Sequence, residues 1–143
     1  MKAVHKTSKK TYAVKIFILR LNLNSEDSIK NEIYYHEILS KKPYILNFFP
    51  KYYGYVKEKA LLGQITYHLV FEYFPYNLRD LITEGTLCQD FSLIKSFFTQ
   101  MVNAFCFLQS CHIAHRDIKP ENILIDETNK NNNYYRFWYR NEI

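Results

Sequence analysis

The stretch HRDIKPENIL, residues 115–124, decides how the rest of this chain is interpreted. It places a carboxylate at Asp117, an ammonium at Lys119 and an amide at Asn122 along one short turn. An ordinary solvated turn between a helix and a strand uses Pro, Asn or Asp for backbone reasons. Such a turn has no use for this full ordered set followed by an apolar run, so the stretch indicates a chemical site.

The pattern H-R-D-x-x-x-x-N resembles the catalytic loop of eukaryotic protein kinases. The resemblance implies that Asp117 orients the substrate hydroxyl and accepts its proton, while Lys119 faces the transferred phosphate. It also implies that Asn122 binds Mg²⁺ and that His115 is structural. The lysine two residues after the aspartate resembles serine/threonine kinases more than tyrosine kinases.

Residues 13–19, AVKIFIL, predict a mostly apolar strand that carries one lysine, Lys15. The strand resembles the V-A-I-K strand of the kinase family, which implies that Lys15 binds the α and β phosphates of ATP. A lone strand lysine is more often a surface residue whose stem covers apolar neighbours, and that alternative stays open here.

A helix is predicted after residues 24–27, NSED, because small polar residues cap helices and acidic residues favour the first turn. It should fray near Pro43. The resemblance implies that one of its glutamates pairs with Lys15, and Glu32 is preferred to Glu37, which points to a different side of the helix. A solvated carboxylate is the alternative for either residue.

Residues 67–75, YHLVFEYFP, predict a buried strand that ends at a proline and leads into a short helix. This segment resembles the kinase hinge. The resemblance implies that Phe71 closes the rear of the adenine pocket, and that backbone groups of Glu72 and Phe74 bind adenine. Taken alone, the segment would be an edge strand running into a turn.

Residues 91–111 predict a long amphipathic helix, and residues 123–125 a short strand after the catalytic loop. The fold class expected is α+β, a kinase-like two-lobe fold with a near-complete N-lobe and a partial helical C-lobe. The expected divisions are an N-lobe at 1–71, a hinge at 72–77, a partial C-lobe at 78–126, and an atypical Asn-rich and aromatic tail at 127–143.

Two family motifs are missing from the sequence. The only glycines are Gly54, Gly63 and Gly85, so no Gly-rich loop precedes Lys15, and no Asp-Phe-Gly follows Asp126. Phosphoryl transfer relies on positioning and on metal-borne neutralisation of charge. We therefore expect this chain to be a fragment with little catalysis of its own, and a protein partner to cover C-lobe surfaces at Phe97, Met101 and Phe105.

Composition excludes several other classes of protein. A hydrophobic share of 48% and a charged share of 23% indicate a globular chain. The net charge of +5 comes with a basic cluster near the N-terminus that is more typical of a solvated hairpin than of a nucleic-acid site. No signal peptide is apparent, and the most apolar segment, 13–21, is too short to span a membrane.

Three cysteines without a Cys-x-x-Cys pair indicate reduced thiols and a cytoplasmic or nuclear location. A zinc site at Cys106, Cys111, His112 and His115 is a weak alternative, because the spacing matches no known finger.

The resemblance implies a serine/threonine protein kinase domain that transfers the γ-phosphate of ATP to a protein hydroxyl, with Mg²⁺ as cofactor. The partners implied are ATP and a protein substrate, without nucleic acid or membrane. The alternative is a pseudokinase or truncated remnant that works as a protein-interaction module, and the missing Asp-Phe-Gly favours it. A small-molecule phosphotransferase of similar fold fits less well, because such enzymes generally lack the pattern at residues 116–121.

Overall fold

A computed structural model describes residues 1–19, 26–44, 46, 48–60, 63–85, 91–126 and, for the backbone alone, 134–137. The described residues form two compact units. The first holds residues up to 44 and residues 50–73, and the second holds residues 46–49 and those from 74 onward. The division between Tyr73 and Phe74 lies inside the segment where the sequence analysis expects a hinge.

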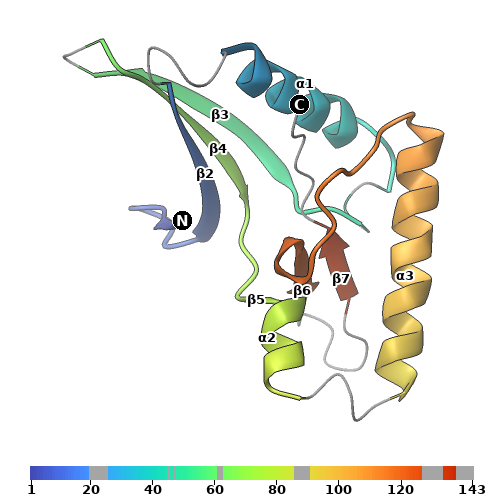
Figure 1. The fold of residues 1–143 in the computed structure, drawn as a ribbon. Helices are drawn as coiled ribbons and strands as arrows, with labels where there is room; N and C mark the ends of the chain where they lie inside the picture. Colours follow the sequence, from blue (N-terminus) through green and yellow to red (C-terminus); the bar gives the residue numbers. More distant parts are fainter. Residues whose placement is uncertain are drawn as a thin grey trace. The chain divides into compact units, whose positions relative to one another are not determined.

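The first unit is an antiparallel sheet with one helix (Figure 1). The strands are β1 (Lys2–Val4), β2 (Thr11–Leu19), β3 (Tyr52–Lys59) and β4 (Ile65–Glu72), in the order β1-β2-β4-β3. Each pair of neighbouring strands is antiparallel. Strand β3 is an element that the sequence analysis did not name, although its run of tyrosines and valine is typical of a strand.

The long hydrophobic strand β4 lies at the centre of this sheet, between β2 and β3. Its side chains alternate, and Tyr67, Leu69 and Phe71 are buried on one face. Residues directly opposite in a ladder share a face. Because Lys15 is paired with Leu69, the register places Lys15 on that buried face.

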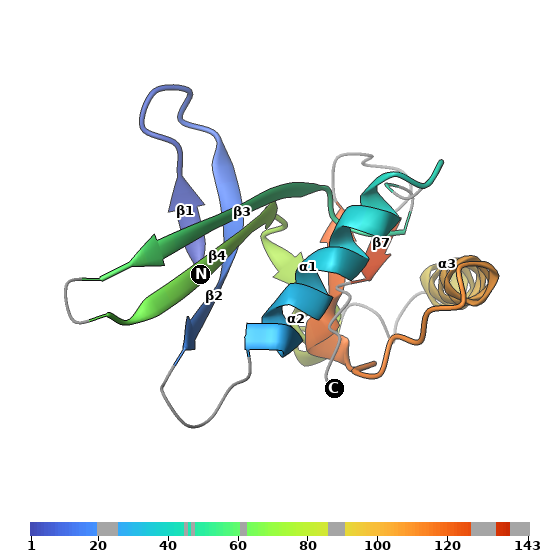
Figure 2. The same cartoon turned by 90° about the horizontal axis from the view of Figure 1, so that it is seen from above.

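Helix α1 (Glu26–Ser40) lies alongside β3 and β4 (Figures 1 and 2). Its buried residues recur at helical spacing: Ile29, Glu32, Ile33, His36 and Leu39. The helix ends before Lys41 and Pro43, as the sequence analysis predicts. Its predicted capping residues, 24 and 25, lie outside the described residues.

The second unit contains a small sheet and two helices. Strand β5 (Tyr76–Asn77), strand β6 (Ile123–Asp126) and strand β7 (Tyr134–Phe137) form an antiparallel sheet in that order. Helix α2 (Leu78–Thr83) follows β5 directly, and helix α3 (Phe91–Ser110) is the predicted long helix. Phe48 and Phe49 contact Phe107 of α3, with ring centroids 5.5 and 6.2 Å apart.

Of the expected tail at 127–143, the structure describes only residues 134–137. Residues 134–137 form β7, paired with β6, whereas the rest of the tail lies outside the described residues. Aromatic residues suit a strand, and β6 offers a ladder edge that β7 takes up. The tail therefore belongs, at least through these four residues, to the sheet that follows the catalytic loop.

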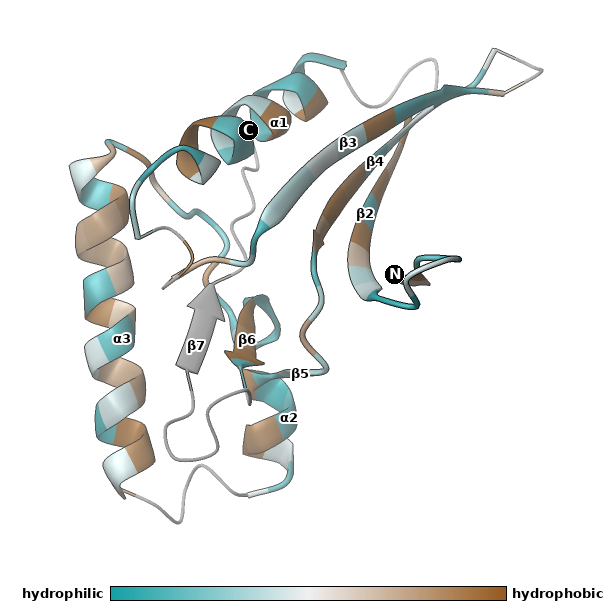
Figure 3. Cartoon of the chain, turned by 180° about the vertical axis from the view of Figure 1, so that it is seen from behind, coloured by the Kyte–Doolittle hydropathy of each residue, from teal (hydrophilic) through white to brown (hydrophobic). Residues whose placement is uncertain are grey.

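Helix α3 buries few of its apolar side chains within the chain. Phe97, Ala104 and Leu108 are buried, whereas Phe91, Phe98 and Val102 are 80%, 52% and 55% exposed. In Figure 3, the ribbon of α3 carries both apolar and polar residues. The expectation of exposed surface is thus correct for the helix, but wrong for Phe97, which is 8% exposed.

By length and composition, α3 is long and apolar enough to cross a membrane. The sequence analysis took residues 13–21 as the most apolar segment and missed this property of α3. The core helix of a globular domain has the same length and composition, so the property by itself assigns no location.

Candidate functional site

An ion pair links the central part of the first sheet to α1. Lys15 Nζ donates to Glu32 Oε1 at 2.6 Å. The side chain of Glu32 is 3% exposed and that of Lys15 is 19% exposed. The pairing expected from the sequence is therefore present, while the role of Lys15 toward ATP remains a prediction.

The helical pattern of α1 explains why Glu32 and not Glu37 is the partner. Glu32 lies among the buried residues of the helix, whereas Glu37 is exposed. Each residue turns the side chain by about 100° around the helix, so five residues carry Glu37 well away from this face. The preference for Glu32 is consistent with this geometry.

A buried histidine lies beside the ion pair. His36 Nε2 is 3.7 Å from Glu32 Oε1, and the ring stacks on Tyr52 and meets Phe71 edge-on, with centroids 5.3 and 4.8 Å apart. Burial lowers the pKa of His36, and Glu32 offsets this in part. The imidazole is therefore neutral at pH 7.

Two opposing effects set the pKa of Glu32. Burial raises it, whereas the neighbouring His36 ring and the Lys15 ammonium lower it, and the net pKa lies below the usual value of a glutamate. Glu32 is therefore a buried carboxylate that stays charged at neutral pH because cationic and polar neighbours compensate its desolvation.

The polar groups of the HRDIKPENIL stretch meet at one carboxylate oxygen in the second unit. Lys119 Nζ lies 2.9 Å from Asp117 Oδ2, and Asn122 Nδ2 donates to the same oxygen at 2.7 Å. Asn122 Nδ2 also donates to the Asp117 carbonyl at 2.9 Å. The three catalytic residues predicted from the motif are thus brought together, with the Asp117 side chain 16% exposed.

Local backbone geometry produces this convergence. Arg116 has a left-handed backbone with φ of 64°, which is uncommon for a residue with a side chain. The buried His115 accepts the Asp117 N–H through Nδ1 at 3.4 Å. A 3-10 turn at Pro120–Asn122 then leads into β6, where Ile123 and Ile125 are buried.

A second ion pair holds this turn to α2. Arg79 donates to Glu121 Oε1 through Nε at 2.9 Å and Nη2 at 2.7 Å. The pKa of Glu121 is lowered by a backbone hydrogen bond and by Arg79. The sequence analysis did not identify this contact, since 42 residues separate the partners.

The side-chain amide oxygen of Asn122 is the type of ligand atom that Mg²⁺ prefers. Both described hydrogen bonds of its side chain use the amide nitrogen, and within the described residues no hydrogen bond engages the amide oxygen. Mg²⁺ is usually bound through one or two protein oxygens together with substrate phosphates and water. The described residues contain no cluster of three His, Cys, Asp or Glu suited to a metal, so Asn122 fits as one ligand of a shared site.

The hinge residues divide between the two units. Phe71 is 2% exposed in β4, and the Glu72 N–H donates to the Lys51 carbonyl at 2.8 Å. Phe74 is the first residue of the second unit after the connection. Among the described residues no hydrogen bond engages the Phe74 backbone. The adenine contacts expected of these residues stay predictions.

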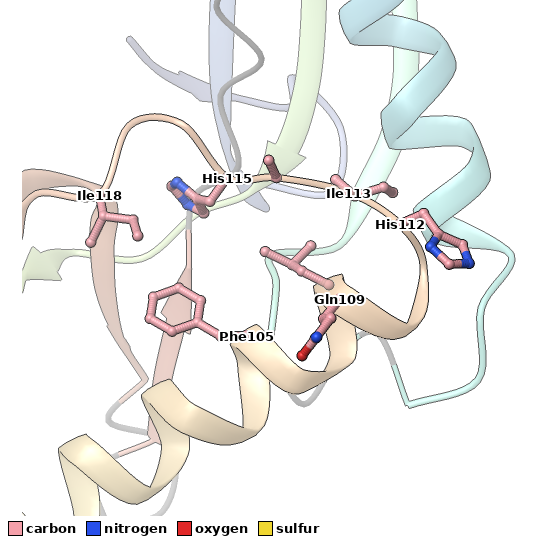
Figure 4. A pocket seen from close by; sticks show the side chains of 8 residues that line it. Phe105, Gln109, His112, Ile113, His115 and Ile118 are labelled. Atoms are coloured by element: carbon pink, nitrogen blue, oxygen red, sulfur yellow. The ribbon is translucent and has the colours of Figure 1, made fainter.

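An open pocket of about 530 Å³ lies between α3 and the segment that follows it (Figure 4). Its lining is mainly apolar and includes Phe105, Leu108, Ile113, His115 and Ile118. The polar residues of the catalytic turn, Asp117, Lys119 and Asn122, are not part of that lining. The lining therefore does not include the carboxylate on which Lys119 and Asn122 converge.

The described residues contain no Gly-rich phosphate loop. Gly54, Gly63 and Gly85 are isolated from one another, each with a positive φ of its own, so they form no phosphate-binding loop. The segment where Asp-Phe-Gly is expected begins after Asp126, and residues 127–133 lie outside the described part of the chain.

Sequence reasoning also missed contacts at the start of α1. Glu26 accepts hydrogen bonds from the Tyr67 hydroxyl and from Lys57 Nζ, the latter at 2.9 Å. The sequence predicts only that the acidic first turn interacts with the helix dipole. The partners lie 31 and 41 residues away, and no local pattern signals them.

Comparison with known proteins places the chain in a family. The family model described as "Protein kinase domain" matches residues 1–134. The chain is 41% identical over 59 residues to a probable CTD kinase subunit alpha homolog of Encephalitozoon cuniculi, a match that covers 41% of this chain and 17% of that protein.

Two further relatives are serine/threonine kinases by name. Serine/threonine-protein kinase ppk8 of Schizosaccharomyces pombe is 41% identical over 58 residues, or 41% of this chain and 11% of that protein. CBL-interacting serine/threonine-protein kinase 14 of Arabidopsis thaliana is 41% identical over 46 residues, 32% of this chain and 10% of that protein. The matched stretches span less than a fifth of these relatives. From the family match over residues 1–134, the chain belongs to the protein kinase domain family, with a partial form of its fold.

Proposed function

We propose that this chain is part of a serine/threonine protein kinase that transfers the γ-phosphate of ATP to a protein hydroxyl. The observation that carries the proposal is the convergence of Lys119 and Asn122 on Asp117 Oδ2. The Lys15–Glu32 pair supports it independently, because it presents a fixed cation on the buried face of the sheet. Membership of the protein kinase domain family supports assigning both arrangements to one reaction.

Each residue has a distinct role in the proposed reaction. The substrate's hydroxyl oxygen attacks the γ-phosphorus, the bond from that phosphorus to the bridging oxygen breaks, and ADP leaves with the electron pair. The hydroxyl proton passes to the Asp117 carboxylate. Lys119 stabilises negative charge on the transferred group, and Lys15 binds the α and β phosphates while Glu32 fixes its ammonium.

Mg²⁺ would be held by the Asn122 amide oxygen together with ATP phosphates and water, and it would neutralise charge on the transferred phosphate. The protein's own part in this is to orient that oxygen. The hydrogen bonds from Asn122 Nδ2 to Asp117 fix the amide plane, so the oxygen points away from Asp117.

A second candidate function is a non-catalytic interaction module. Two observations favour it: the sequence lacks Asp-Phe-Gly and a Gly-rich loop, and α3 exposes Phe98 and Val102. The two candidates differ in what the purified chain does with ATP and magnesium. A kinase domain binds the nucleotide and transfers phosphate, whereas an interaction module of this type transfers none, whether or not it binds the nucleotide.

The test uses the full 143-residue chain, a library of Ser/Thr peptides, and labelled ATP with magnesium. Asp117→Asn keeps the shape of the side chain and removes the base, so we expect transfer to fall by about 10²- to 10⁴-fold with ATP binding unchanged. Asp27→Asn is the matched control, because the Asp27 side chain is 84% exposed on α1. Transfer by Asp117→Asn at the wild-type rate would remove Asp117 from the mechanism.

Binding is measured separately from transfer. Saturating ATP should stabilise the chain against unfolding by about 2.7 kcal/mol when its concentration is 100 times the dissociation constant. Lys15→Met should abolish that stabilisation, and Lys30→Met, on an exposed lysine of α1, should preserve it. Binding without transfer, or no binding at all, supports the interaction module instead.

A further inference from the structure

The first residue of α1 makes contacts that helix formation does not require. Glu26 accepts from the Tyr67 hydroxyl of β4 and from Lys57 Nζ of β3 at 2.9 Å. An acidic residue in the first helical turn is stabilised by the helix dipole even when it points into solvent. Here the side chain turns to the sheet, where it is 32% exposed. We name Glu26, Tyr67 and Lys57 the α1 clamp.

The members of the α1 clamp are bound closely to one another. Tyr67 is 3% exposed, and a buried tyrosine hydroxyl needs a partner, which Glu26 provides. Lys57 Nζ also lies 5.1 Å from the centre of the Tyr67 ring. The pKa of Glu26 is lowered to about 2, first by the Tyr67 hydrogen bond and then by Lys57. The clamp is therefore charged throughout the neutral pH range.

The α1 clamp and the Lys15–Glu32 pair both join α1 to the same sheet. Glu26 and Glu32 are six residues apart, or about 9 Å along the axis at 1.5 Å per residue. Both carboxylates reach the sheet, one at β3 and β4 and the other at β2. At the later end of α1, His36 packs against Tyr52 and Phe71. The clamp thus joins the N-terminal end of α1 to the sheet, while His36 packs near its C-terminal end.

We propose that the α1 clamp positions Glu32 against Lys15, so that Tyr67, Glu26 and Lys57 are positioning residues for the phosphate-binding lysine. The consequence for ATP binding rests on the proposed function. The consequence for the Lys15–Glu32 pair does not, because both contacts lie within the first unit. With the clamp intact, the pair forms without a nucleotide and without another protein.

Tyr67→Phe removes the hydroxyl and keeps the buried ring. Tyr55→Phe is the matched control, since Tyr55 lies on β3 with its ring 6.0 Å from that of Tyr67 and its hydroxyl makes no hydrogen bond among the described residues. The readout is the ¹³C resonance of the Glu32 carboxyl at pH 7, recorded without nucleotide. Lys15→Met provides the reference position for a Glu32 that has lost its partner.

We expect the Glu32 resonance of Tyr67→Phe to move toward that of Lys15→Met, and that of Tyr55→Phe to stay at the wild-type position. Glu26→Gln should move it in the same direction by a smaller amount, since the amide oxygen still accepts a hydrogen bond. A Tyr67→Phe resonance at the wild-type position overturns the proposal. A purely structural role would lower stability and leave this resonance in place.

ATP affinity provides the second measurement. Tyr67→Phe should weaken binding about tenfold, and should have no further effect in a Glu32→Gln chain, because the clamp acts through Glu32. An equal loss in both backgrounds overturns the proposal. If the wild-type chain binds no ATP, the proposed function fails, and the Glu32 resonance still decides whether the clamp positions the ion pair.

Discussion

Removing the cation of the Lys15–Glu32 pair should destabilise the chain more than removing its carboxylate. At 2.6 Å and an effective dielectric constant of about 20, the two charges attract by about 6 kcal/mol. Desolvation of both groups consumes much of this. Lys15→Met leaves a carboxylate that is 3% exposed without its cation, so we expect a loss of about 3 kcal/mol of unfolding free energy.

Glu32→Gln should cost less, about 1 kcal/mol. The Lys15 side chain is 19% exposed, and its flexible stem allows the ammonium to reach water once the carboxylate is gone. The double variant Lys15→Met with Glu32→Gln should be more stable than Lys15→Met alone, because no uncompensated charge remains buried.

The pH dependence follows from the sign of the pKa shift at Glu32. In the wild type its pKa lies below the ordinary 4.5, so its contribution to stability is present above about pH 4.5 and is lost as the pH falls through the lower folded value. In Lys15→Met burial is less opposed and the pKa of Glu32 rises. Glu32 of Lys15→Met is therefore protonated at a higher pH than Glu32 of the wild type, and this protonation removes the uncompensated buried charge. The stability difference between the two proteins should therefore shrink from pH 7 to pH 4.

The assay is urea unfolding followed by far-ultraviolet circular dichroism at both pH values, with Lys30→Met as the control for loss of an exposed lysine. The reasoning is refuted if Glu32→Gln costs as much as Lys15→Met, or if the difference between Lys15→Met and the wild type is the same at pH 4 and pH 7. Either result would mean that the burial of Glu32 does not govern the energetics of this pair.

Two further predictions concern helix α2 and the turn beside it. Asn77 caps α2 by accepting the Asp80 N–H at 3.3 Å, while Asp80 accepts the Asn77 N–H at 2.8 Å, so Asn77→Ala should cost about 1 kcal/mol in urea unfolding. An unchanged midpoint would show that the capping box is dispensable. Arg79→Ala removes the exposed pair with Glu121, whose side chains are 60% and 42% exposed, and should cost no more than about 1 kcal/mol. That loss should decline from 50 mM to 1 M salt, and a salt-independent loss would point to packing of the arginine stem instead.

Much of the catalytic turn was predictable because its residues are neighbours in sequence. Asp117, Lys119 and Asn122 are so close along the chain that one local conformation brings them together, and that conformation needs only the left-handed Arg116 and the turn at Pro120. The long helix α3 was predictable for a similar reason, since its apolar residues recur at a spacing that no other element produces.

Contacts across the sheet were less predictable. The choice of Glu32 over Glu37 could be made from the helical period, but the neighbouring His36 and the α1 clamp depend on which strands lie side by side. Strand β7 shows the same limit. Its composition suits many structures, and it becomes a strand because β6 offers an unpaired ladder edge.

The sequence by itself determined the family, the order of the motifs and the candidate residues for the chemistry, because these depend on residue types at short, fixed spacings. Only the tertiary structure decided which charged side chains form ion pairs and hydrogen bonds with residues far away in the sequence. The strand order β1-β2-β4-β3 places β3 and β4 beside α1, and this brings Glu26 to Lys57 and Tyr67 across 31 and 41 residues. Burial then determines the energy of each contact. A carboxylate in water is well solvated, whereas a buried carboxylate loses that solvation and needs a cation or hydrogen-bond donors to offset the cost.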